Sequence, residues 1–123
     1  MKLTEAEETL MQYLWDAKKA FMKDLLDTYP EPKPAPTTVA TLLKRMIDKG
    51  FVAYREYGNS REYYPLIEKN DYFSKQMNGM INKFFNNSVT QFASFFTSKT
   101  DFSESELEEL KKIIDNQIEK KKK

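Results

Sequence analysis

Threonine, lysine and arginine side chains recur between residues 37 and 61, and these residue types bind phosphates and base edges. Five of them share one side of a potential helix: Thr37, Thr38, Thr41, Lys44 and Arg45. Threonine is a poor helix former on a solvated face, so three threonines there indicate a role other than helix stability. We therefore expect this face to contact the bases and phosphates of DNA. The alternative from this helix alone is an ordinary solvated face.

A second basic pair lies just downstream. Arg55 and Arg61 flank Gly58-Asn59-Ser60, a sequence that permits a tight reversal between two short strands. Near the tip of such a hairpin, the two arginines are placed to grip a phosphate or enter the minor groove. The competing interpretation is a protein-interaction module without DNA binding, which the overall charge of +1 and the tyrosines of the hairpin favour.

Composition excludes several classes of function. The chain has no cysteine and no histidine, which excludes disulfides, thiolate chemistry, Ser-His-Asp catalysis and the usual zinc sites. We expect no catalytic residues, no metal and no cofactor, and therefore not an enzyme. The net charge of +1 conceals a local excess, because Lys33 to Arg61 holds six basic and two acidic side chains, or +4. The preceding residues are acidic in balance.

Three helices precede the hairpin in the predicted N-terminal domain. A capping box, Thr4 to Glu7, begins a helix over residues 5–16, and a shorter apolar repeat predicts a helix over 21–29. The segment PEPKPAP then predicts a stiff connector, the alternative being a ligand for a proline-binding domain. Pro36 occupies the first position of the third helix, and Gly50 ends it.

The C-terminal part is rich in phenylalanine, with seven of the nine between Phe73 and Phe102. Apolar stripes predict helices over 69–86 and from Val89, and a second capping box at Ser103 begins a last helix. So much apolar surface is best buried against a second copy, whereas a monomeric bundle is the alternative. The predicted dimerisation residues are Phe73, Met77, Ile81, Phe84, Phe85, Phe92, Phe95, Phe96, Leu107, Leu110 and Ile114.

The expected fold is mainly α with a small β-hairpin wing. Residues 1–66 would form a winged helix-turn-helix DNA-binding domain, and residues 67–123 a helical dimerisation domain. Apolar runs fall well short of the roughly 20 residues that a membrane span needs. The first ten residues carry acids where a secretory signal is apolar, so we expect a cytoplasmic protein.

Three segments resemble one family. LTEAEETLMQYLW, TTVATLLKRMIDKGFVAYREYGNSREYYPL and FSESELEELKKII together resemble the penicillinase repressors, the BlaI/MecI/CopY-type regulators. The resemblance covers nearly the whole chain. It implies a transcriptional repressor that binds a palindromic operator as a homodimer, through the helix and wing residues named above. The proline-rich PEPKPAP departs from the family pattern.

The resemblance also implies a mode of regulation. Penicillinase repressors are inactivated by proteolysis in the dimerisation domain, triggered through a membrane sensor-protease. Rough alignment places the cleavage region at Phe95 and Phe96, where this chain has Phe-Phe in place of the usual Asn-Phe. Copper-responsive members carry C-terminal cysteines, which this chain lacks.

Overall fold

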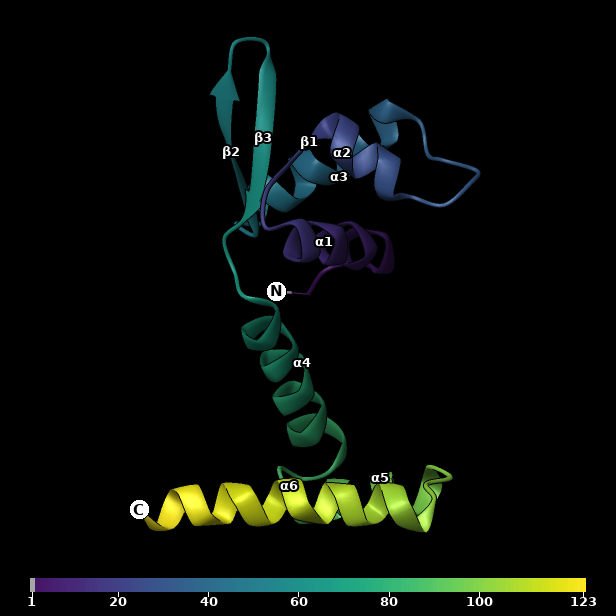
Figure 1. Ribbon diagram of the computed structural model, residues 1–123, viewed down its shortest axis with the longest axis vertical. Coiled ribbons are helices and arrows are strands. Elements are labelled where there is room, and N and C mark those ends of the chain that lie inside the picture. Colours follow the sequence, from purple (N-terminus) through teal and green to yellow (C-terminus); the bar gives the residue numbers. More distant parts are fainter. Residues whose placement is uncertain (1) are drawn as a thin grey trace. The chain divides into compact units, whose positions relative to one another are not determined.

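The computed structural model describes residues 2–123 and divides the chain into two compact units (Figure 1). The first unit extends to Gln76, and the second covers Met77–Lys123. The elements are α1 (Glu5–Ala17), β1 (Ala20–Phe21), α2 (Met22–Thr28), α3 (Pro36–Asp48), β2 (Val52–Tyr57), β3 (Ser60–Pro65), α4 (Lys69–Phe84), α5 (Val89–Lys99) and α6 (Glu104–Lys122). The predicted fold class is confirmed: the chain is mainly helical, with one small antiparallel sheet.

The sheet has three strands in the order β1-β3-β2, one more than the predicted hairpin. β1 is only two residues long, with Ala20 opposite Tyr63, and so brief a strand has no readable periodicity. The prediction that the second helix begins at Phe21 was therefore wrong: Phe21 is extended and belongs to β1. Its N–H donates to the Asp24 carboxylate at 3.0 Å, which caps α2.

β2 and β3 form the predicted hairpin, joined by a two-residue loop. Tyr57 pairs with Ser60, so Gly58 and Asn59 form the turn. Gly58 has φ of +62° at the first loop position, where a type II′ turn favours glycine. The turn sets the register of the wing, and the register decides which side chains share a face.

The core of the first unit joins its helices to the base of the sheet. The largest fully buried side chains include Leu10, Met11 and Leu14 from α1, Leu25 from α2, Val39, Leu43 and Met46 from α3, Val52 from β2 and Tyr72 from α4. Each large apolar side chain buried in this way contributes about 1.5–3 kcal/mol. Trp15 packs against this core, and its Nε1–H donates to the Ile67 carbonyl at 2.9 Å.

The second unit is held largely by phenylalanine contacts. Phe85 lies 5.5 Å from Phe92 and 5.4 Å from Phe95 between ring centroids, and Phe92 stacks on Phe96 at 5.8 Å. Ser103 and Glu106 form the predicted capping box of α6. α4 ends at Phe84 rather than at the predicted Asn86, because Asn86 and Asn87 both adopt positive φ.

None of the helices described is long and apolar enough to cross a membrane.

Candidate nucleic-acid interface

α3 separates an apolar face from a polar one. Pro36 stands at its first turn, as predicted, and Gly50 beyond its end has φ of +84°. Val39, Leu43 and Met46 are at most 1% exposed. The five predicted DNA-binding residues all lie on the exposed side: Thr37, Thr38, Thr41, Lys44 and Arg45. The structure thus brings together the residues that the sequence singled out, on a helix held from behind by the core.

Two of these side chains already have partners on α3 itself. The Thr41 hydroxyl donates to the Thr37 carbonyl at 2.9 Å, so its proton is used within the helix while its oxygen can still accept a hydrogen bond. Lys44 Nζ lies 3.3 Å from an Asp48 carboxylate oxygen, and both side chains are well exposed. A phosphate must therefore compete with Asp48 for Lys44.

The wing places its two arginines on opposite faces of the hairpin. In the strand register, Arg55 lies opposite Glu62, and Arg61 lies opposite Glu56 in the next residue pair. Because successive residue pairs of a ladder point to opposite faces, the two arginines do so as well. The Arg55 guanidinium lies 5.6 Å from the Tyr64 ring, and the Arg61 guanidinium lies 4.3 Å from the Tyr54 ring. Cation–π contacts at these distances hold both groups along the strands. Each arginine therefore offers its charge to a different side of the wing.

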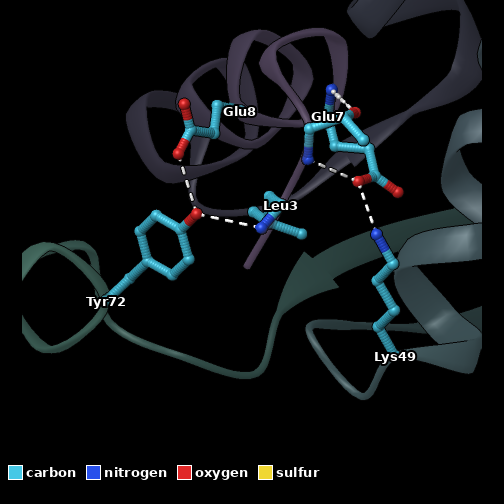
Figure 2. Close-up of polar contacts among 6 residues, drawn as sticks. Leu3, Glu7, Glu8, Lys49 and Tyr72 are labelled. Atoms are coloured by element: carbon cyan, nitrogen blue, oxygen red, sulfur yellow. Dashed lines mark hydrogen bonds and ion pairs between the residues drawn. The ribbon is translucent and has the colours of Figure 1, made fainter. Parts of the chain in front are cut away.

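A buried ion pair ties the end of α3 to the start of α1 (Figure 2). Lys49 Nζ lies 2.7 Å from Glu7 Oε1, which also accepts from the Thr4 N–H at 2.7 Å. Burial opposes ionisation of Glu7, but the hydrogen bonds from Lys49 and Thr4 outweigh it and lower the pKa of the carboxyl. The other oxygen, Oε2, is buried without a hydrogen-bond partner among the described residues. Lys49 thus belongs to the scaffold and not to the basic strip, by which we mean the excess of positive charge between Lys33 and Arg61.

Tyr72 connects the first turn of α4 to the N-terminal segment, as Figure 2 also shows. Its hydroxyl accepts from the Leu3 N–H at 3.0 Å and donates to a Glu8 carboxylate oxygen at 2.7 Å. Burial and the hydrogen bond to Glu8 raise the pKa of Tyr72, so it remains a donor at neutral pH. Tyr72 falls within the apolar stripe that predicts a helix over residues 69–86. Its polar role is visible only once residues 3, 8 and 72 are brought together.

The order helix, strand, helix, helix, strand, strand in the first unit is that of a winged helix-turn-helix, a class of DNA-binding fold that presents its third helix to the major groove. A sequence profile of the family described as "Penicillinase repressor" matches residues 3–116. The chain belongs to the penicillinase repressor family. The predicted resemblance is thereby confirmed.

Two relatives and one solved structure show which known proteins this chain is similar to. The methicillin resistance regulatory protein MecI of Staphylococcus aureus (strain N315) is 29% identical over 114 residues, which cover 92% of this chain and 93% of MecI. The penicillinase repressor of Bacillus licheniformis is 24% identical over 98% of this chain and 95% of its own length. The solution structure of the DNA-binding domain of the repressor BlaI aligns with 58% of this chain and 88% of its own, at 25% identity and a TM-score of 0.48.

Family membership confirms the general function expected from the sequence. The family consists of DNA-binding repressors and not of enzymes. The prediction of a DNA-binding transcriptional repressor therefore stands, in preference to an interaction module without DNA binding. The contacts of individual side chains with DNA and the pairing of two copies remain predictions.

Proposed function

We propose that this protein represses transcription in the cytoplasm as a homodimer on a palindromic operator. Residues 1–66 would act as the DNA-binding domain, and residues 67–123 as the dimerisation domain. In each protomer, α3 would read one half-site in the major groove, with Arg55 and Arg61 of the wing adding backbone contacts. The observation that carries the proposal is the exposed row of threonine and basic side chains on α3, opposite a buried apolar face.

Exposed apolar side chains support a dimer. Phe84 is 68% exposed and Ile114 is 59% exposed, although both are large and apolar. Others of the predicted set with at least 40% exposure are Phe73, Met77, Phe95, Phe96 and Leu107. So many large apolar side chains in contact with solvent favour an interaction site. A second copy of the same chain satisfies it with a closed, self-complementary contact.

Several of the predicted dimerisation residues also have roles within one chain, and Ile81 and Phe73 are two examples. Ile81 is only 6% exposed, and Phe73 lies 5.7 Å from Trp15 between ring centroids. Contacts within one chain therefore already cover part of both side chains. The more exposed residues of the predicted set are the stronger candidates for the contact between two chains.

We further propose that repression ends when a membrane sensor-protease triggers cleavage of the chain near Phe95 and Phe96. Both side chains lie within α5, and both contact the phenylalanine cluster of their own unit. Proteases cleave extended backbone, so cutting here requires local opening of α5. Cleavage would separate Phe92 from Phe102 and remove the support of the dimerisation surface.

A binding selection tests the core of the proposal. The purified chain is used to select duplexes from a random pool, and the selected site is then footprinted. We expect protection related by a two-fold axis, with half-site centres about one or more helical turns apart. Light scattering on the complex should give two chains per duplex. A selected site without internal symmetry, or one chain per duplex, would contradict the homodimeric mode of binding.

A further inference from the structure

The C-terminal end of α2 has an unusual partner. The last carbonyl groups of any helix have no N–H donor within the helix for their oxygens to accept from. Here Lys33 Nζ donates to three carbonyl oxygens at this end: Leu26 at 3.2 Å, Asp27 at 3.2 Å and Tyr29 at 2.7 Å. A positive charge also complements the negative end of the helix. The Lys33 ammonium group is thus occupied by the protein's own backbone.

The segment that carries Lys33 leads directly into the recognition helix. Prolines at 30, 32, 34 and 36 restrict the backbone on both sides of it. The Lys33 N–H also donates to a Glu31 carboxylate oxygen at 3.3 Å. Only two residues separate Lys33 from Pro36, the first residue of α3. Anchoring Lys33 on α2 therefore restrains where α3 begins.

We propose that Lys33 is a positioning residue for operator recognition: it clamps the proline-rich connector to the end of α2 and so sets the start of α3, rather than contacting a phosphate. The inference rests on the proposed DNA-binding function. Charge counting places Lys33 in the basic strip together with Lys44. The structure separates the two, because Lys33 caps a helix and Lys44 lies on the exposed face of α3.

The two roles differ in salt dependence. A lysine on a phosphate releases a counterion, so its loss lowers the slope of log K against log salt by about one per protomer. A positioning residue leaves the slope unchanged, because no phosphate contact is lost. Its loss instead lowers discrimination, since a displaced α3 start misaligns Thr37 and Thr38 while nonspecific backbone contacts persist.

The test uses the full chain with Lys33→Met, which keeps the aliphatic stem and removes the donors. We expect roughly two- to fivefold weaker binding to the selected operator, near-unchanged binding to random duplex, and an unchanged salt slope. Lys33→Arg, which retains donors for the same carbonyls, should restore most of the discrimination. Lys44→Ala serves as the phosphate-contact comparison, and Lys75→Met on α4 as the control for loss of an exposed lysine.

Three outcomes overturn the assignment or its basis. A slope reduced by about one in Lys33→Met would make Lys33 a phosphate contact. Unchanged operator discrimination in Lys33→Met would leave it without a positioning role. Wild-type protein that binds no duplex at low salt would instead refute the proposed function itself. If Lys33→Met fails to fold, Lys33→Gln decides the matter, because it keeps N–H donors for the carbonyls and removes the charge. An unchanged salt slope then supports a positioning role, and a slope reduced by about one makes Lys33 a phosphate contact.

Discussion

At Lys44, the ion pair with Asp48 limits how much charge α3 presents to DNA. Asp48 also brings a negative charge to the face proposed to meet phosphates, and it sits unfavourably at the C-terminal end of a helix. We expect Asp48→Asn to strengthen operator binding by roughly two- to fivefold at low salt, without loss of stability. A salt titration of operator binding measures the change, with Asp71→Asn on α4 as control. Equal effects of the two substitutions would place Asp48 away from the DNA.

The ion pair between Glu7 and Lys49 leads to a second prediction, which concerns the stability of the fold. Lys49→Met leaves the carboxylate of Glu7, whose side chain is fully buried, with only the Thr4 N–H. We expect a loss of about 3 kcal/mol in the free energy of unfolding at pH 7. Glu7→Gln combined with Lys49→Met should recover part of it, because no unpaired charge then remains buried. Urea unfolding of the three proteins gives the comparison, and a double variant no better than Lys49→Met would argue against charge burial as the cause.

The same pair has a defined pH dependence. The pKa of Glu7 is lowered in the folded state from its ordinary 4.5, so its contribution is present above about pH 4.5 and is lost as pH falls through the lower folded value. The difference in unfolding free energy between wild type and Lys49→Met should therefore narrow on acidification. A constant difference from pH 7 to pH 3 would show that Glu7 is not the group responsible.

Among the elements, those with a long, regular pattern were predictable and those made by distant contacts were not. α3 follows from Pro36, Gly50 and a clear apolar arc, and both capping boxes are local signals. β1 escaped prediction because two residues carry no pattern, and it exists only through pairing with β3. Its partner residues lie more than 40 positions away, a distance over which sequence spacing gives no information.

The candidate site divides in the same way. The exposed face of α3 could be predicted because helical spacing alone places its side chains together. The intramolecular partners of Lys33, Lys49 and Lys44 could not be predicted, because a count of charges does not show which group each lysine contacts. The sequence therefore overestimates the free positive charge of the basic strip, and the difference lies in contacts that form only on folding.

The attachment of α4 to the first unit gives a prediction at the level of an element. Tyr72→Phe keeps the ring in the core but leaves the N–H of Leu3, a residue 2% exposed, without its acceptor. We expect a loss of roughly 1–3 kcal/mol in unfolding free energy. Tyr57→Phe, at a side chain that is 53% exposed, is the matched control and should change stability little. Similar losses in both variants would mean that the Tyr72 hydroxyl contributes nothing specific.

For the whole molecule, the second unit buries little of its own apolar surface. Among its residues Ile81 is the one buried apolar side chain, whereas α4, α5 and α6 all carry large apolar side chains in contact with solvent. An isolated unit of this kind gains little from hydrophobic burial. Pairing two chains would supply that burial and would also bring two copies of α3 to one operator. Stability and DNA affinity are thus expected to depend on the same contact.

Phe84 allows this dependence to be tested. Its side chain is 68% exposed, so Phe84→Glu costs a single chain little, whereas in a dimer it would bury a charge at the contact between chains. Phe92 is less suitable, because its ring packs on Phe85 and Phe96 within one chain. We expect Phe84→Glu to convert the dimer to a monomer by light scattering. Operator binding should fall by about a hundredfold or more, because two half-sites are no longer engaged together.

Asn82→Glu, at an exposed polar position on the same helix, adds the same charge and should leave both properties intact. A Phe84→Glu protein that remains dimeric at micromolar concentration would remove Phe84 from the proposed interface, and a monomer that retains full operator affinity would show that pairing is not required for operator binding.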